Sequence, residues 1–220
     1  MRLLQRLFGG GRRPRGEPRP DDVMGRRHRG PVHKVVVGLG NPGPNYDATR
    51  HNVGWWVVDR LAADWGDGTF SETGPLLSTV ARVGGHEVLL AKPLTYMNRS
   101  GLAVRSILEA HPTLDPAEDL LVVVDDATRE VGGVRFRPEG GSGGHRGLRS
   151  ISDVLEGDGY PRLRVGVGQA PKGADLAQWV LSPMPSEDEA VVVDLLPWIS
   201  EAVHIWVEEG TQAAMNRFNR

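Results

Sequence analysis

Cysteine is absent from this chain of 220 residues, aromatic residues make up only 6%, and the formal net charge is −2. The missing cysteines exclude disulfides, thiolate nucleophiles and cysteine-bound metals. A chain this close to neutral does not bind nucleic acid through its overall charge, so only a local basic patch would support such a role. With no thiol to oxidise and no disulfide framework, we expect the protein to work in the cytoplasm.

Long apolar runs are also missing. No stretch of about 18 consecutive apolar residues is present, so we expect no membrane-spanning segment. The first 16 residues have too short an apolar patch and no cleavage-site pattern, which argues against a secretory signal. The seven histidines form no H-E-x-x-H motif, and no G-x-x-x-x-G-K-[ST] is found. We therefore expect neither a metal nor another cofactor.

Composition divides the chain into two parts. Residues 1–31 are rich in Gly, Pro and Arg and show no hydrophobic period, which predicts a disordered tail. Two roles for it stay open: an extension without a fixed function, or an electrostatic arm for RNA or a membrane surface. Residues 32–220 alternate between apolar strand patterns and amphipathic helix patterns. This predicts a single α/β domain built on a mixed twisted sheet with helices on both faces.

The expected elements can be placed by number. Apolar or alternating runs predict strands at 35–37, 77–83, 86–92, 120–124, 133–137 and 162–168, the second and third joined by a Gly-Gly turn. Helical spacing predicts helices at 49–64, with Thr49 or Asp47 as its cap, at 102–110 and 148–155, and from 175 to the end. Ligands of such sheets gather beyond the carboxyl ends of the strands.

The stretch GLGNPG, residues 38–43, matches the G-x-G-x-x-G of a dinucleotide-binding loop. Pro42 and Pro44 each remove a backbone donor, however, and the next helix starts too late to meet a pyrophosphate. The acidic residue expected about twenty positions further on, at the tip of a second strand, is also missing. We therefore expect the loop to serve another purpose, which is to place Asn41 at a strand tip and His51 at the start of a helix.

His51 and Asp125 form a candidate catalytic pair. A helix N-terminus disfavours the imidazolium ion, so His51 is expected to be neutral, as a general base must be. Asp125 follows the apolar strand 120–124 and is placed to hold one nitrogen of that ring while the other faces a water. The alternatives are a structural histidine and an aspartate that caps the next turn.

Amides and phenols in loops complete the candidate site. Asn41 and Asn98 do not titrate, so they suit orientation of a substrate or donation to a developing oxyanion, or else they are turn residues. Tyr46 and Tyr96 lie in loops, where an exposed ring can stack on a base or a sugar, or merely pack.

A second glycine-rich stretch, GGSGGHRG at 140–147, lies among several arginines. Ser142 satisfies G-x-S-x-G and could complete a serine-hydrolase triad with His51 and Asp125, although glycine this dense matches that pattern by chance. Phosphate binding is the better-supported alternative, because glycines let a backbone approach a phosphate and four arginines supply the charge: Arg137, Arg146, Arg162 and Arg164.

Taken together, the motifs GLGNPGPNYDATRHNVG, KPLTYMNRSG, LVVVDD, GGSGGHRGLRSI, RLRVGVG and AMNRFN resemble the bacterial peptidyl-tRNA hydrolase family. They occur in order from Lys34 to Asn219. The resemblance implies a monomeric α/β enzyme that hydrolyses, without a metal, the ester between a peptide and the 3′ ribose of its tRNA. Such an enzyme recycles tRNA from stalled or dropped-off translation.

The resemblance also implies roles for individual residues. His51 is similar to the general base of the family, and Asp125 to the carboxylate that stabilises it. Asn41 is similar to the residue that tells a blocked from a free aminoacyl group. Contacts with tRNA are implied for Tyr46, Tyr96 and Asn98, and a grip on the 5′ phosphate for Arg137 and Arg164.

Two positions depart from the family pattern. The glycine loop of the family usually ends G-G-H-N-G, whereas Arg146 stands here in place of the amide, and a guanidinium cannot accept a hydrogen bond. After Asp125 the family commonly has E-L-D, whereas this chain has Asp126-Ala127-Thr128. These changes leave open an alternative, an RNA-binding relative with weak catalysis or none.

Overall fold

A seven-stranded sheet organises the computed structural model, which describes residues 31–219. Its strands are β1 (Lys34–Gly38), β2 (Ser71–Thr73), β3 (Leu76–Val83), β4 (His86–Pro93), β5 (Leu120–Asp126), β6 (Val134–Arg137) and β7 (Arg162–Gly166). They lie in the order β2-β3-β4-β1-β5-β7-β6. The four central strands are parallel, and β2, β3 and β6 pair antiparallel to their neighbours. The predicted mixed sheet is confirmed.

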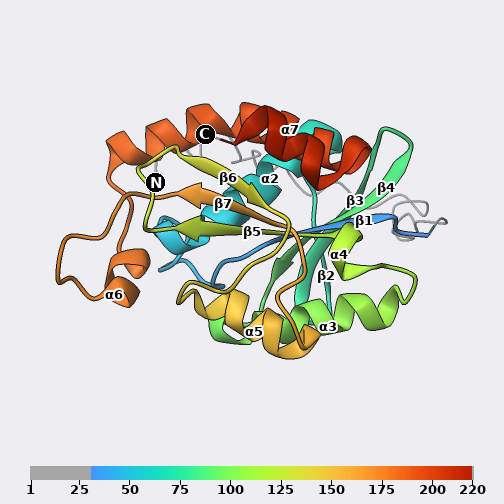
Figure 1. The fold of residues 1–220 in the computed structure, drawn as a ribbon, viewed down its shortest axis with the longest axis horizontal. Coiled ribbons are helices and arrows are strands. Elements are labelled where there is room, and N and C mark those ends of the chain that lie inside the picture. The colour runs from blue at the N-terminus through green and yellow to red at the C-terminus, as the bar shows by residue number, and fades with distance from the viewer. Residues whose placement is uncertain (1–30, 220) are drawn as a thin grey trace, which may run out of the picture.

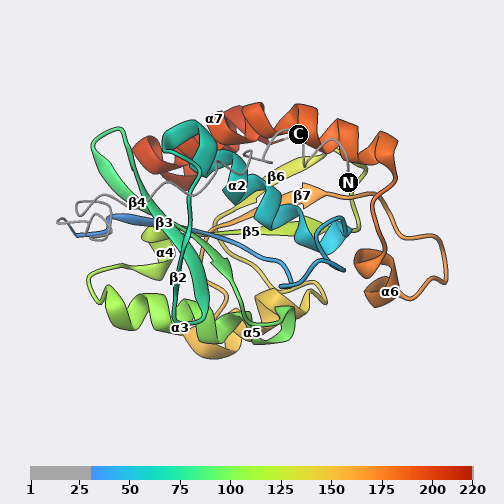
Figure 2. The same ribbon diagram turned by 180° about the vertical axis from the view of Figure 1, so that it is seen from behind.

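Helices cover both faces of this sheet. In Figures 1 and 2, α2 (Val53–Trp65) and α7 (Ser186–Phe218) lie on one face, and α3 (Ser100–Ala110) and α5 (Arg146–Leu155) lie on the other. The side chains of β1 alternate between two hydrophobic clusters: Val36 packs with the first pair of helices, Val35 and Val37 with the second. Because both faces of the central strands are buried, their sequences are continuously apolar.

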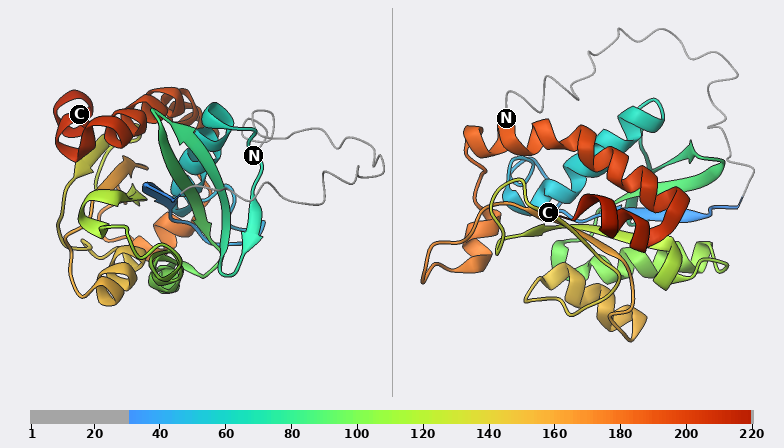
Figure 3. Two further views of the ribbon diagram at one scale, coloured as in Figure 1. Left: turned by 90° about the vertical axis from the view of Figure 1, so that its right-hand side faces the viewer. Right: turned by 45° about the horizontal axis from the view of Figure 1, so that its top comes forward.

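Helix α7 has the length and apolar composition of a membrane-spanning helix. Its most apolar stretch is nevertheless 56% buried inside the protein, where Val203 and Trp206 are fully enclosed in the core. This packing is that of a core helix. Figure 3 shows α7 lying along the sheet, and α6 (Leu176–Leu181) set apart from both helix layers. Charged residues interrupt the sequence of α7, so no uninterrupted apolar run reveals this property.

Several predicted details need correction. A short 3-10 turn, η2 (Arg50–Asn52), precedes α2, and neither Thr49 nor Asp47 caps it, because the Thr49 hydroxyl donates instead to the Tyr46 carbonyl. Strand β5 does not stop at Asp125, since Asp125 pairs with Val165 of β7. Three short elements were not expected: β2, η3 (Met97–Arg99) and α4 (Pro116–Asp119).

The disordered tail predicted for residues 1–31 falls, but for its last residue, outside the described residues. The tail and the domain boundary after it therefore stay predictions.

Candidate active site

The carboxyl ends of β1 and β5 open into a cavity of about 440 Å³, which we call the histidine pocket. The two strands are parallel neighbours, so the loops that follow them meet at one edge of the sheet. All four residues that the sequence predicts to be catalytic contribute to its lining: Asn41, His51, Asn98 and Asp125. Sequence positions more than eighty residues apart thus meet where such a sheet binds its ligands.

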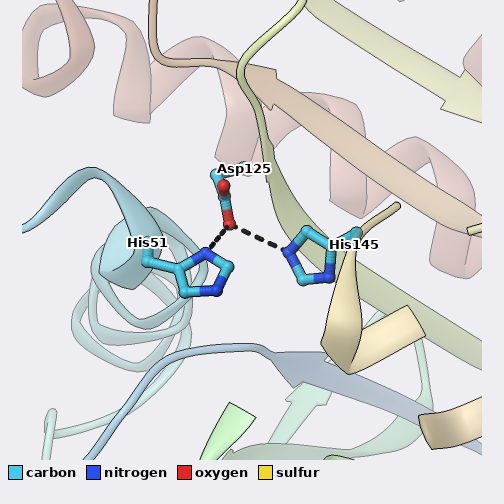
Figure 4. A group of neighbouring side chains, drawn as sticks. All are labelled: His51, Asp125 and His145. Carbon is cyan, nitrogen blue, oxygen red and sulfur yellow. Dashed lines mark hydrogen bonds and ion pairs between the residues drawn. The ribbon is translucent and has the colours of Figure 1, made fainter. Parts of the chain in front are cut away.

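Asp125 lies between two histidines (Figure 4). Its Oδ1 atom is 2.7 Å from Nδ1 of His51 and 3.0 Å from Nε2 of His145. The centroids of the two rings are 5.0 Å apart. All three side chains are at least nine-tenths buried. The predicted pair is therefore part of a triad, and its third member, His145, was missed.

The hydrogen-bond partners fix the proton positions in neutral rings. A carboxylate only accepts hydrogen bonds, so Nδ1 of His51 carries the proton and Nε2 keeps its lone pair. The Leu148 amide donates to Nδ1 of His145 over 3.2 Å, so the proton of that ring lies on Nε2 and points at Asp125. His51 is thus left with a basic nitrogen, whereas both nitrogens of His145 are occupied.

Asp125 is ionised in this setting. Burial alone would raise the pKa of its carboxyl, but the positive charge that His51 and His145 carry when protonated, together with their hydrogen bonds, outweighs burial and holds the pKa well below its usual range. A fixed negative charge beside His51 is suited to stabilise the imidazolium that forms when the ring takes up a proton.

The triad also has the composition of a metal site, since its ligand atoms lie within 4.8 Å of one another. Metal on Nε2 of His145 would need a lone pair there and a proton on Nδ1. That proton would face the Leu148 N–H, a second donor. The helix amide therefore favours the hydrogen-bonded triad over metal ligation.

Close packing holds the first glycine loop, residues 38–43. A Cβ atom on Gly38 would overlap the carbonyl of Gly54 in α2, and one on Gly54 would lie 2.6 Å from the backbones of Leu39 and Val123. The side chain of Asn52 fastens the loop to η2, because its amide donates to the Asn41 carbonyl and its oxygen accepts from the Asn41 N–H. Strand, loop and helix are thereby joined directly beside His51.

Arg50 anchors the other side of η2. Its guanidinium lies 3.8 Å from the centre of the Trp179 ring and donates to Ser182 and to the carbonyl of Val167. Burial lowers the pKa of Arg50, and the nearby Asp188 opposes that shift. This contact ties the turn that carries His51 to helix α6.

Asn41 is buried and directional. Its Oδ1 accepts from the Met97 N–H over 2.8 Å, and within residues 31–219 its NH₂ group makes no hydrogen bond. Asn98 lies next to Met97 in η3 and is exposed at the pocket wall. The two amides predicted to handle the ester therefore approach the same cavity from neighbouring loops.

Tyr46 and Tyr96 form an aromatic rim. Their rings meet edge to face with centroids 6.4 Å apart, and Tyr96 is 56% exposed. Across the pocket, α6 adds apolar side chains that sequence reasoning did not assign: Leu176, Ala177, Val180 and Leu181. The entrance thus combines stacking surfaces with an apolar wall.

A second cavity of about 820 Å³, the arginine pocket, adjoins the first and shares four residues with it: Asp126, Thr128, Gly143 and Arg164. Its lining includes Arg129, Arg135 and the exposed Arg137. Arg164 donates to Asp126 and to the Ser142 carbonyl, and so ties the second glycine loop, residues 140–147, to the sheet. Of the two predicted phosphate ligands, Arg137 is open to solvent and Arg164 is half-buried.

The prediction that Arg162 supplies charge for phosphate is wrong. Its guanidinium is buried and donates to the carbonyls of Gly140, Asp158 and Tyr160. Burial lowers the pKa of Arg162, against the opposing influence of Tyr160 and Asp158. Arg162 is thus a structural residue that closes the base of the loop.

Both departures from the family pattern lie at the pockets. Thr128 donates through its N–H and its hydroxyl to Oδ1 of Asp126. Burial would raise the pKa of Asp126, but these bonds and Arg164 together lower it. The family pattern has a further carboxylate at the position of Thr128. In this chain Thr128 instead stabilises the ionised carboxyl of Asp126. Arg146 is exposed at the wall of the histidine pocket.

Two alternative hypotheses find no support in this geometry. The backbone groups of the first glycine loop are engaged, since Leu39 N–H donates to Val123 and Asn41 is fastened by Asn52, so no row of amides faces a pyrophosphate. Ser142 does not line the histidine pocket, and among residues 31–219 its hydroxyl is bonded to neither histidine. A serine triad is not assembled.

His145 offered one sequence signal that was not used. It lies three residues before the helix predicted at 148–155, and in the structure, where α5 begins at Arg146, it is the residue whose side chain caps the first turn. A ring that caps with Nδ1 turns Nε2 in a fixed direction, and here that direction meets Asp125. The fold, and no local pattern, brings the carboxylate there.

Comparison with known proteins agrees with this geometry. The family model described as peptidyl-tRNA hydrolase matches residues 35–220. The peptidyl-tRNA hydrolase of Gemmatimonas aurantiaca is 44% identical over 190 residues, which cover 85% of this chain and 100% of that protein. That of Aquifex aeolicus is 45% identical, with 85% and 96% covered.

Solved structures give the same result. The crystal structure of peptidyl-tRNA hydrolase from Acinetobacter baumannii superposes with a TM-score of 0.78 at 34% identity, and 84% of this chain and 94% of that chain are covered. Fold, site and relatives lead to one conclusion: the chain belongs to the peptidyl-tRNA hydrolase family.

Proposed function

We propose that this protein hydrolyses the ester between a peptide and the 3′ ribose of its tRNA, with a water molecule activated by His51. One observation carries the proposal: Asp125 binds Nδ1 of His51 and leaves Nε2 as the basic atom in a pocket at the strand ends. A family of ester hydrolases whose motifs match along the whole described domain supports the substrate.

The proposed reaction needs only the groups of the histidine pocket. A water O–H proton passes to Nε2 of His51 as the water oxygen bonds to the ester carbonyl carbon. The tetrahedral intermediate then collapses, the bond from carbon to the ribose 3′ oxygen breaks, and His51 returns its proton to that oxygen. The Asp125 carboxylate stabilises the imidazolium between these steps.

Asn41 and Asn98 are proposed to act on the ester itself. The bond to Met97 leaves the Asn41 NH₂ group as a directed donor, suited to the developing oxyanion or to the carbonyl of a blocked amino group. Asn98, exposed beside it, supplies a second amide. Each donor of this kind is worth about 10²–10³ in rate.

The tRNA is proposed to lie across both pockets. Tyr46 and Tyr96 present an edge on which a base or sugar of the 3′ end stacks. Arg137 and Arg164 hold a phosphate in the arginine pocket. Because the two pockets share residues, the acceptor end runs continuously from the phosphate contacts to His51.

We further propose a monomer that works in the cytoplasm without a metal or another cofactor and away from membranes. The absence of cysteine supports the cytoplasm, the burial of α7 in the core supports a place away from membranes, and the donor that occupies Nδ1 of His145 supports a site without a metal. The monomer is proposed from the family resemblance.

Single-turnover cleavage of an N-acetylated aminoacyl-tRNA tests the function, with Ser142→Ala as the matched variant. We expect the wild-type protein and Ser142→Ala to release the acid at the same rate. Loss of activity in a folded Ser142→Ala variant would replace water attack with a serine nucleophile. Tight tRNA binding without any cleavage by the wild type would assign the protein to RNA binding alone.

A further inference from the structure

Arg146 is the feature of the histidine pocket that the proposed reaction leaves unused. It is the first residue of α5 and directly follows His145, whose ring contacts Asp125. Its side chain is exposed and lines the same cavity as His51 and Asn98. Arg146 therefore belongs to the wall of the reaction site rather than to a remote surface.

Within residues 31–219, the guanidinium of Arg146 makes no hydrogen bond or ion pair. The other cation of the pocket wall, Arg164, is engaged by Asp126 and the Ser142 carbonyl. Asp125, the carboxylate that contacts the neighbouring His145, is hydrogen-bonded to the two histidines and not to Arg146. Arg146 thus offers five N–H donors and a permanent charge to whatever enters the pocket.

The loop before Arg146 leaves room for a ligand backbone. Gly143 and Gly144 line the pocket, and a Cβ atom on Gly144 would meet nothing within 4 Å. A Cβ atom on Gly143 would meet the Arg164 guanidinium at 3.4 Å, so two arginines, Arg146 and Arg164, border this stretch of the wall. A guanidinium beside exposed backbone suits a phosphate oxygen pair, which it binds through two parallel N–H bonds.

We propose that Arg146 binds the phosphodiester on the 5′ side of the terminal nucleotide of tRNA. The inference rests on the proposed function, which places the 3′ ester at His51. In that position the terminal ribose alone separates the ester from this phosphodiester, which makes it the nearest anion that every tRNA substrate carries. An asparagine would offer a neutral amide at this position, whereas the charged guanidinium of Arg146 binds a phosphate electrostatically.

A double-mutant cycle tests this contact on full-length substrate. The variants are the wild type and Arg146→Asn, and the tRNAs carry either the natural phosphodiester or an uncharged methylphosphonate at that one position. Affinity is measured with tRNAs whose 3′ peptide is held by a non-hydrolysable amide, and kcat/KM with the corresponding esters. Arg105→Asn serves as control, since Arg105 is an exposed residue of α3 outside both pockets.

We expect Arg146→Asn to weaken binding of the natural tRNA about tenfold, as the loss of a charged hydrogen bond does. Neutralising the phosphate should weaken wild-type binding by a similar factor, and the two changes together should cost no more than either one. The salt slope of Arg146→Asn should fall by about 0.7, the value for one single-stranded phosphate contact. Arg105→Asn should match the wild type.

Additive losses would overturn the inference, because they would show that Arg146 and this phosphate act independently. An unchanged affinity in Arg146→Asn would do the same. The affinity measurements use the non-hydrolysable amide and so do not depend on catalysis. If the cycle shows coupling but no ester is cleaved, the proposed function fails and the phosphate contact stands.

Discussion

The two glycine loops share a composition but differ in what surrounds them. In the first, residues 38–43, the positions that Cβ atoms of Gly38 and Gly40 would occupy are filled by Gly54 and Trp55. In the second, residues 140–147, such atoms on Gly140, Gly141 and Gly144 would meet nothing within 4 Å. The first loop needs glycine at Gly38 and Gly40 because the protein packs against them, whereas the second has glycine at 140, 141 and 144 where the protein leaves space. The second loop is packed only at its end, where a Cβ atom on Gly147 would lie 2.6 Å from the side chains of Leu39 and Met97.

This difference separates two tasks within one site. The packed loop fixes Asn41 and leads to His51, so its glycines help to hold the catalytic side chains in position. The open loop borders both pockets beside Arg146 and Arg164, so its glycines leave room for a substrate to enter them. A motif of glycines alone does not reveal which task applies, because the decisive atoms belong to residues distant in sequence.

The largest expected effect comes from the chemistry that the packed loop serves. Asp125→Asn replaces the carboxylate that fixes the His51 tautomer with an amide. We expect single-turnover ester cleavage to fall by about 10³–10⁴-fold while tRNA affinity stays within about twofold, because the ring is no longer held with its lone pair on Nε2. Equal losses in affinity and rate would instead assign Asp125 to substrate binding.

A matched pair of glycine substitutions tests the comparison directly. Gly38→Ala forces a methyl group into the backbone of Gly54 and should lower the free energy of unfolding by about 3 kcal/mol. Gly141→Ala, which has open space and an ordinary backbone angle, should change it by less than about 0.5 kcal/mol. Urea unfolding measures both. Similar losses in the two variants would remove the distinction between packed and open loops.

Acid unfolding probes the triad with a smaller effect. The pKa of Asp125 is depressed in the folded protein, so its stabilising contribution is present above the ordinary Asp pKa of about 4 and is lost as the pH falls from there through the folded pKa. Between pH 5 and 3 the wild type should therefore lose about 1–2 kcal/mol more than Asp125→Asn. Parallel curves would show that the carboxyl titrates normally.

The smallest effect is expected at the open end of the arginine pocket. Arg137→Ala removes one exposed cation and should weaken tRNA binding a few-fold, with the slope of log affinity against log salt reduced by about 0.9. Fluorescence anisotropy at several salt concentrations measures this. A loss of affinity with an unchanged slope would mean that Arg137 acts through shape and not through charge.

Local pattern was enough to predict most of the architecture. The apolar runs at 35–37 and 120–124 are buried on both faces, so their composition alone revealed central strands. The Gly-Gly turn between β3 and β4 likewise determined a hairpin. The apolar character of α7 and the short elements η2 and β2 escaped, because charged residues interrupt the first and the others have no period long enough to detect.

The site was predictable only as far as motif and topology reach. The sequence pairs His51 with Asp125 because it predicts the first at a helix start and the second at a strand tip, but the part of His145 depends on the Leu148 amide that fixes its ring. Arg162 and Arg164 looked equivalent in sequence, two residues apart on one strand. Both have guanidiniums that donate to the loop and both line the arginine pocket, yet Arg162 is buried and only Arg164 also lines the histidine pocket. Only the three-dimensional path of residues 140–147 separates the two.

The most direct test of the central claim is the single-turnover rate of N-acetyl-aminoacyl-tRNA cleavage by the wild type and His51→Asn, with His204→Asn on α7 as control. The account predicts rapid cleavage by the wild type and by His204→Asn. In His51→Asn it predicts a rate that is lower by a factor of about 10³ or more, with tRNA affinity retained. Cleavage at the wild-type rate by a folded His51→Asn variant would contradict it.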